Sequence, residues 1–171
     1  AVLLTACSDS APTKQDVSPK SKVEDTASKK VIKNTTNKSP ASVMRAIKKS
    51  TRSDADKADD GIRKTAEVLT FTGIMPRMTV LELEAGGGYY TELFSSMVGP
   101  KGKVIYQNPV SFDNFLKPEN ITARFGEDGK RLPNVERQKS NFDDLSYIED
   151  NSVDIVTWFL GPHVLRLANS K

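Results

Sequence analysis

A run of three glycines is the part of the sequence best suited to hold a ligand against the backbone. An apolar run, residues 79–84, leads into it, and an amphipathic segment of helical spacing follows and ends at Gly99-Pro100. A second β-type run covers residues 103–107. Glycine has no Cβ atom, so the backbone can turn tightly and approach a ligand closely. This order of strand, glycine turn, helix and strand predicts a βαβ unit that binds a nucleoside-like ligand at a helix N-terminus.

Two common nucleotide-binding loops fit this turn poorly. A dinucleotide site needs G-x-G-x-x-G and an acid about 20 residues further on. Thr91 stands at the third glycine position, and Gln107 or Asn108 ends the second strand. A Walker A loop needs Gly-Lys-Ser/Thr, which the sequence lacks near this turn. A nicotinamide-dependent enzyme is therefore the weakest hypothesis, and a sheet with a glycine turn but no ligand is a further alternative.

Residues 82–88 resemble the first motif of class I S-adenosylmethionine-dependent methyltransferases, which reads acid-x-Gly-x-Gly-x-Gly. Glu82 matches the acid, the last two glycines match, and Glu84 stands where the first glycine is expected. Residues 67–82, the three glycines and residues 90–93 also resemble bacterial predicted methyltransferases with a signal sequence, in which a non-glycine at that position is normal. The resemblance covers roughly residues 50–163 and implies methyl transfer from S-adenosyl-L-methionine.

The resemblance also implies a set of cofactor-binding residues. In the family, an acid at the position of Asn108 grips the ribose, and an acid at the position of Asn141 meets the adenine. Amides at these two positions can still form hydrogen bonds, but without charge assistance. The implied cofactor-binding residues are Glu82, Gly86, Gly87, Gly88, Asn108, Asn141 and Phe142.

The predicted fold class is α/β, a Rossmann-like methyltransferase sheet. Strands are expected at residues 79–84, 103–107, 135–139 and 153–160, which are strands one to four only. Two helices precede them, one opened by Ser39-Pro40 and one running from Ser53 to about Thr70. Acidic residues in the first turns of the second helix suit its dipole, and no histidine accompanies them as a metal ligand. Since the family sheet has seven strands, the sequence is interpreted as a fragment truncated at both ends. A partner chain that completes the sheet and a frameshifted product are the alternatives.

The start of the chain has a different composition from the rest. Residues 1–7 end in Leu4-Thr5-Ala6-Cys7, which resembles a bacterial lipobox, and are interpreted as the remnant of a signal peptide. Residues 8–39 are polar and predict a disordered linker. Residues 40–171 form the partial methyltransferase-like domain. Cys7 is thus the expected lipidation site, with attachment to the membrane of the bacterial envelope. A short buried strand with an incidental cysteine, in a cytoplasmic protein, is the alternative.

The catalytic residue and the substrate are not fixed by any motif. His163, the sole histidine, is a candidate base near neutral pH, although a surface-loop residue is the favoured interpretation. The substrate is an unknown small molecule or envelope component, and no metal is expected. The net charge of +3 is too balanced to indicate nucleic acid. Export away from cytoplasmic S-adenosylmethionine supports a second hypothesis, a non-catalytic envelope binding module that keeps the fold.

Overall fold

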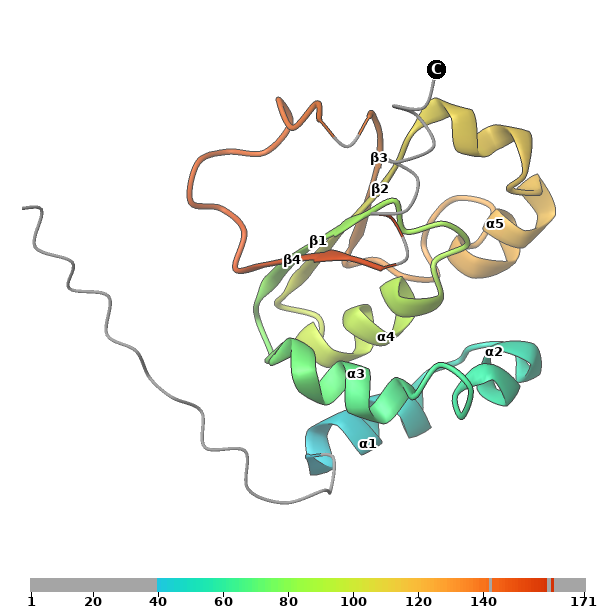
Figure 1. Cartoon of the computed structure of the whole chain (residues 1–171), viewed down its shortest axis with the longest axis vertical. Coiled ribbons are helices and arrows are strands. Elements are labelled where there is room, and N and C mark those ends of the chain that lie inside the picture. Colours follow the sequence, from blue (N-terminus) through green and yellow to red (C-terminus); the bar gives the residue numbers. More distant parts are fainter. Residues whose placement is uncertain (1–39, 142, 160, 162–171) are drawn as a thin grey trace, which may run out of the picture. The chain divides into compact units, whose positions relative to one another are not determined.

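The computed structural model describes residues 40–141, 143–159 and 161 (Figure 1). Every described residue belongs to the compact unit Asn37–Lys171. Its helices and strands are, in chain order, α1 (Ala41–Lys49), α2 (Asp54–Asp59), α3 (Thr65–Thr72), β1 (Thr79–Leu83), α4 (Tyr89–Val98), β2 (Lys103–Asn108), the 3-10 helix η1 (Val110–Asn114), α5 (Pro118–Phe125), β3 (Val135–Lys139) and β4 (Ile155–Trp158).

The four strands form one parallel sheet in the order β3-β2-β1-β4. Val80 of β1 is paired with Val104 of β2 on one side and with Ile155 of β4 on the other. Parallel neighbours require crossover connections, and α4 supplies the one between β1 and β2. This arrangement confirms the predicted Rossmann-like α/β class.

The strand positions agree with the prediction except at the strand ends. β1 ends at Leu83, one residue early, because Glu84 turns into the left-handed region at φ 48°. β2 extends by one residue to Asn108. β4 covers only Ile155–Trp158 of the expected 153–160, since Asp154 anchors the preceding turn to β1. Residue 160 lies outside the described residues.

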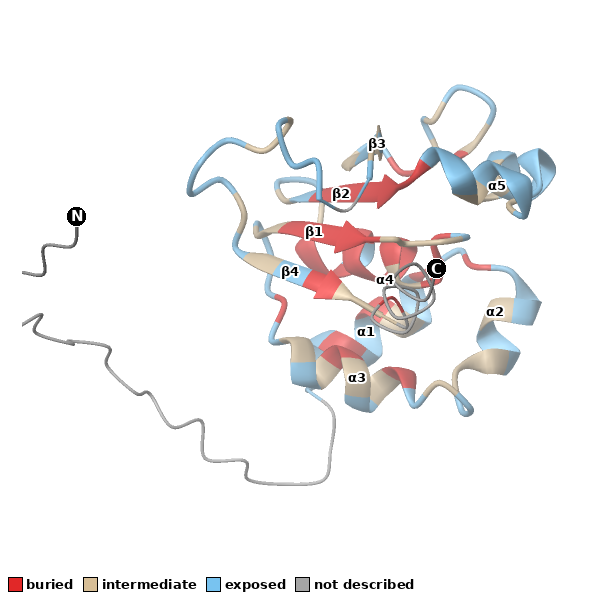
Figure 2. Ribbon diagram, turned by 45° about the horizontal axis from the view of Figure 1, so that its top comes forward, coloured by how far each residue is buried: buried red, intermediate tan, exposed pale blue. Residues whose placement is uncertain are grey.

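The core lies between the sheet and three helices on one of its faces. α1, α3 and α4 cover that face (Figure 2), where Leu93 and Phe94 of α4 are fully buried. Burying a side chain of this size contributes roughly 1.5–3 kcal/mol. On the other face, Leu81, Leu83 and Ile105 pack against residues of the segment before β4. The helix that follows the glycine turn is therefore held by packing along most of its length.

The single helix predicted from Ser53 to about Thr70 is wrong. The structure has two helices, α2 and α3, separated by a turn over residues 60–64. Lys64 occupies the left-handed region at φ 48° and so cannot continue α2 into α3. The predicted start is confirmed, because the Ser53 side chain accepts a hydrogen bond from the amide of Asp56.

The structure also has elements that the sequence reasoning did not identify. η1 and α5 lie between β2 and β3, and α5 begins with Pro118 at a first-turn position. In the part of the chain that the structure describes, no helix is long and apolar enough to cross a membrane. The expected lipobox, with Cys7, and the expected linker fall outside the described residues.

Candidate functional site

The glycine turn adopts backbone conformations that favour glycine at two of its positions. Gly86 has φ 59°, and Gly88, which caps the N-terminus of α4, has φ 78°. A Cβ atom at Gly88 would also lie 3.3 Å from Thr91 Oγ1 and 3.3 Å from Arg124 Cγ. At Gly87 a Cβ atom would meet no protein atom within 4 Å. Gly88 is thus required by the fold, whereas the open space at Gly87 faces outward from the turn.

Glu84 adopts a glycine-like conformation at the position where the methyltransferase motif has glycine. Its φ of 48° is unfavourable for a residue with a Cβ atom by roughly 1–2 kcal/mol. Two contacts hold it there. Its Oε2 accepts a hydrogen bond from Trp158 Nε1 at 2.8 Å, and its amide donates to Gln107 Oε1 at 2.9 Å. The departure from the family pattern therefore changes the side chain while keeping the course of the turn.

Asn108 fastens the glycine turn to the end of β2. Its Oδ1 accepts from the amide of Gly86 at 2.9 Å, and its Nδ2 donates to the carbonyl of Gly86 at 2.9 Å and to Tyr106 Oη at 2.5 Å. Only 6% of Asn108 is exposed. In this conformation the Asn108 side chain is hydrogen-bonded to the backbone of the glycine turn. Its predicted contact with a ribose stays a prediction.

Glu82 is a carboxyl group buried between β1 and α4. It is 2% exposed, and its Oε2 accepts a hydrogen bond from Thr91 Oγ1 at 2.6 Å. Burial raises the pKa of Glu82 from the ordinary 4.5 to about 8, against the opposing effects of Thr91 and Arg124. At neutral pH the residue is therefore mostly uncharged and can donate as well as accept a hydrogen bond.

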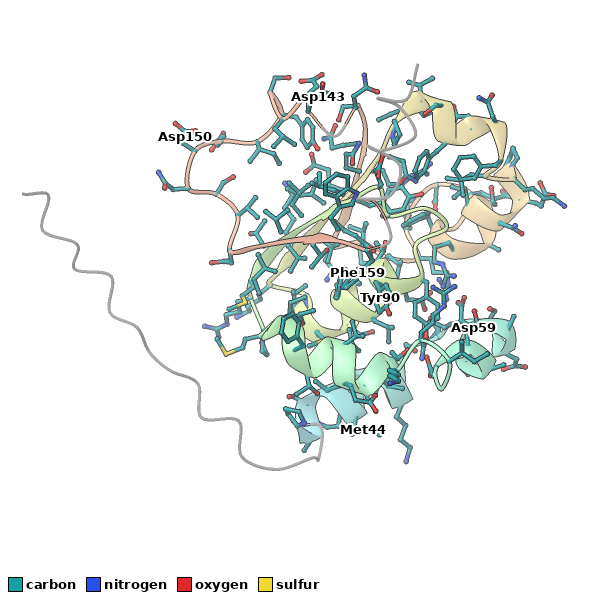
Figure 3. All side chains as sticks on the ribbon, viewed as in Figure 1. Met44, Asp59, Tyr90, Asp143, Asp150 and Phe159 are labelled. Atoms are coloured by element: carbon teal, nitrogen blue, oxygen red, sulfur yellow. The ribbon has the colours of Figure 1, made fainter. Side chains whose placement is uncertain are left out.

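A cavity of about 630 Å³ opens beside the glycine turn. Tyr90 and Phe159 lie side by side in Figure 3, with ring centroids 4.3 Å apart, and form an aromatic wall of it. A second cavity of about 630 Å³ lies beside Asn108, between α5 and β3. The first is the candidate site because the glycine turn and the buried acid both border it. Its lining residues are Asp56, Arg63, Glu82, Leu83, Glu84, Ala85, Gly86, Gly87, Tyr89, Tyr90, Ser111, Phe112, Phe115, Arg124, Phe159 and Gly161.

Arg124 of α5 connects the glycine turn to the helices that precede the sheet. It donates from Nε to the carbonyl of Gly87 at 3.1 Å, and its Nη1 lies 2.6 Å from Asp56 Oδ2 and 2.8 Å from Glu92 Oε2. Burial alone would raise the pKa of Glu92, but hydrogen bonds from Arg131 and Arg124 lower it. These ion pairs join α5 to α2 and to α4 beside the turn.

A second polar network fixes the turn between α2 and α3. The Arg52 guanidinium is 2.7 Å from Asp60 Oδ1, and the Tyr89 hydroxyl donates to the same oxygen at 2.5 Å. Thr65 Oγ1 lies 2.6 Å from that hydroxyl. Burial, and then the hydrogen bond to Asp60, raise the pKa of Tyr89 to about 12, so it remains a donor. Two of the acids that were expected to suit a helix dipole, Asp56 and Asp60, thus form ion pairs with Arg124 and Arg52.

The structure brings together only some of the predicted site residues. Glu82 and two of the glycines line the cavity, and Gly88 supports the turn from beneath it. Asn108 contacts the turn, whereas Asn141, exposed, follows the neighbouring strand β3. Phe142 and His163 lie outside the described residues, so their predicted roles stay predictions. Among residues 40–141, 143–159 and 161, no group of three or more potential metal ligands occurs.

Sequence reasoning missed the walls of the cavity. Arg63, Tyr90, Arg124 and Phe159 come from four separate segments, and only the fold brings them together. Tyr90 did carry a signal, because it follows the glycines directly and begins the helix. Nothing in the local sequence around Arg124 distinguishes it from a surface arginine, since its partners Asp56 and Glu92 are distant in the chain.

The parallel sheet, with a glycine turn after β1 and polar residues at the ends of β2 and β3, has the Rossmann-like arrangement in which ligands bind at the carboxyl ends of the strands. More particularly, residues 40–110 match the family model described as protein-L-isoaspartate(D-aspartate) O-methyltransferase (PCMT). The match confirms the predicted resemblance, and it covers the segment from α1 to the start of η1.

One solved structure is similar to a larger part of the chain. It is a SAM-dependent methyltransferase from Aquifex aeolicus, with 28% sequence identity and a TM-score of 0.44 over 68% of this chain. The chain spans 55% of the length of that protein. Among curated proteins, no match is found.

Proposed function

We propose that the protein transfers the methyl group of S-adenosylmethionine to an acceptor bound beside the glycine turn. The observation that carries this proposal is the position of the cavity at the carboxyl ends of the parallel strands, bordered by Gly86, Gly87 and the buried Glu82. Ligands of open α/β sheets bind at this edge. The match of residues 40–110 to a methyltransferase family supports the same assignment.

The residues present fit the cofactor at two points. The glycine turn lets the backbone approach the methionine and ribose portions, and the pair Tyr90 and Phe159 offers apolar surface to the sulfonium region. Asn108 holds the turn at its underside. The cofactor supplies a methyl group already activated for transfer, and the protein's task is to align an acceptor atom with it and exclude water.

The class of acceptor follows from the family only in outline. The matched family is described as methylating an oxygen of protein L-isoaspartate or D-aspartate. A carboxylate oxygen is therefore the first acceptor to test here, with isoaspartyl peptides as the probe. A small molecule or an envelope component remains the wider class proposed from the sequence.

Transfer of a labelled methyl group tests the activity. We expect label from S-adenosylmethionine to reach an isoaspartyl peptide or an envelope extract with the wild-type chain. Gly87→Leu should abolish transfer, since Gly87 borders the cavity and a large side chain there competes with a ligand for the space, while Gly87→Ala should retain most of it. Transfer that is equally fast with Gly87→Leu would contradict the proposal, as would the absence of labelled product with the wild-type chain.

A specific observation supports a second candidate function, a non-catalytic binding module. Both backbone polar groups of Gly86 are bonded to Asn108, so a ligand reaching them would compete with an existing contact. Weak cofactor affinity would follow. Capture of an envelope partner by the wild-type chain and equally by Gly87→Leu, without any methylated product, would favour this function.

We further propose attachment of the chain to the bacterial envelope through a lipid on Cys7. The support is the lipobox-like sequence of residues 4–7 and the polar composition of residues 8–39. Partitioning into detergent after expression with the complete gene tests the attachment. The wild-type protein should enter the detergent phase and Cys7→Ser the aqueous phase, whereas identical partitioning of the two would contradict it.

A further inference from the structure

Arg63 is a cation of the cavity wall for which the proposed function gives no role. It lies in the turn between α2 and α3, apart in sequence from the glycine turn. Its guanidinium carbon is 4.4 Å from the centroid of the Tyr89 ring, and 36% of its side chain is exposed. A guanidinium stacked on an aromatic face and open to a cavity is well placed to bind an anionic group.

The side-chain hydrogen bond described for Arg63 uses Nε and leaves its two Nη groups for a ligand. Within the described residues, its contact is from Nε to Asp59 Oδ2 at 3.2 Å, and the Asp59 side chain is 48% exposed. An exposed pair of this kind is weak. Because Nε makes this bond, the two Nη groups form the fork that matches a carboxylate.

The other charges of the cavity decide which kind of anion fits. Arg124 is paired with Asp56 at 2.6 Å and with Glu92 at 2.8 Å, so its charge is already balanced. Glu84, on the glycine turn, adds an acid to the same cavity. A dianion such as phosphate would therefore meet negative groups as well as Arg63. A zwitterion, with a carboxylate for Arg63 and an ammonium group for Glu84, suits both.

The turn that carries Arg63 is held in place by hydrogen bonds to Asp60. Asp60, three residues earlier, is held by Arg52 at 2.7 Å and by the Tyr89 hydroxyl at 2.5 Å. Arg52 is 2% exposed, so this anchor is a buried one. The turn over residues 60–64 is therefore a rigid support, which is the property that a ligand-binding side chain needs.

We propose that Arg63 binds the carboxylate at the amino-acid end of S-adenosylmethionine, with Glu84 facing the ammonium group of the same end. The inference rests on the proposed function, because it takes the cofactor of that reaction as the ligand. It adds to the site a residue from the α2–α3 turn. It also gives Glu84 a role that glycine at this position would not provide.

Two adenosyl probes separate this contact from the rest of the site. S-adenosylhomocysteine carries the amino-acid end, and 5′-methylthioadenosine lacks it. Calorimetric titration of the chain should show Arg63→Met binding S-adenosylhomocysteine about 10- to 100-fold more weakly than wild type. Its affinity for 5′-methylthioadenosine should stay within about twofold. Arg63→Lys, which keeps the charge, should lose less. Arg45→Met, an exposed change of the same charge on α1, should alter neither affinity.

The outcomes distinguish this inference from the function on which it rests. Binding of neither probe to the wild-type chain would overturn the proposed function and this inference together. Binding of both probes to Arg63→Met with wild-type affinity would overturn the inference alone. An equal loss for both probes would also overturn it, because that result indicates a general disturbance of the site.

Discussion

At the scale of single residues, the Glu82 carboxyl group has an environment that opposes its charge. It is almost completely enclosed, and it accepts a hydrogen bond from the Thr91 hydroxyl. Its pKa is raised to about 8 by burial. In the methyltransferase motif this position carries an acid, and here the acid is held mostly in its neutral form at the base of the cavity.

Glu82 predicts a specific pH dependence of stability. The unfolded chain releases the proton near pH 4.5, whereas the folded chain keeps it until about pH 8. The folded state therefore binds more protons across this window, and the free energy of unfolding contributed by Glu82 falls as pH rises through it. Urea unfolding at pH 5 and pH 8 should show a larger loss for wild type than for Glu82→Gln. The same loss in both proteins would show that Glu82 ionises normally.

The two glycines Gly87 and Gly88 are expected to respond differently to replacement by alanine. Gly88→Ala should lower the free energy of unfolding by roughly 1–2 kcal/mol from its left-handed backbone alone, with more from the close contacts to Thr91 and Arg124. Gly87→Ala should change it by less than about 0.5 kcal/mol, because its Cβ atom enters open space. Denaturant titration of the two variants measures the difference. Equal destabilisation would contradict the described course of the turn.

At the scale of elements, the site depends on the turn between α2 and α3 as much as on the glycine turn. Tyr89, at the start of α4, reaches across to Asp60 and Thr65 in that segment. The contact links the helix beneath the glycine turn to the wall that carries Arg63. A substitution that destabilises the α2–α3 turn should therefore also destabilise the start of α4, and the reverse.

Tyr89→Phe tests this connection. Loss of the hydroxyl removes one hydrogen bond from Asp60, which keeps Arg52, and one from Thr65, at a cost of about 1–3 kcal/mol in the free energy of unfolding. Amide hydrogen exchange over residues 60–65 should become faster, while exchange in β1 keeps pace with global unfolding alone. Unchanged exchange over residues 60–65 would show that the turn is held by other contacts.

At the scale of the whole molecule, β4 lies at an edge of the described sheet and exposes apolar surface. Val156 of this strand is 57% exposed. An edge of this kind favours pairing with another chain. Val156→Lys should reduce concentration-dependent self-association, measured by sedimentation, without altering the fold. Unchanged association of Val156→Lys would place the contact elsewhere.

The sequence predicted the parts of the fold that depend on local patterns. The β1–glycine turn–α4–β2 unit, β3 and the centre of β4 follow from apolar runs and glycine positions. The break between α2 and α3 was missed, although Gly61 marks it, because acidic residues around it also suit a helix. The cavity walls could not be predicted, since Arg63, Tyr90 and Phe159 meet only through the packing of separate elements.

A crystal structure of the chain with S-adenosylhomocysteine tests the central claim most directly. The account predicts that the ligand occupies the cavity bordered by the glycine turn, Tyr90 and Phe159, with its carboxylate at Arg63. Density for the ligand in the second cavity, between α5 and β3, or no density at a concentration that saturates binding, would contradict the assignment of the glycine turn as the cofactor site.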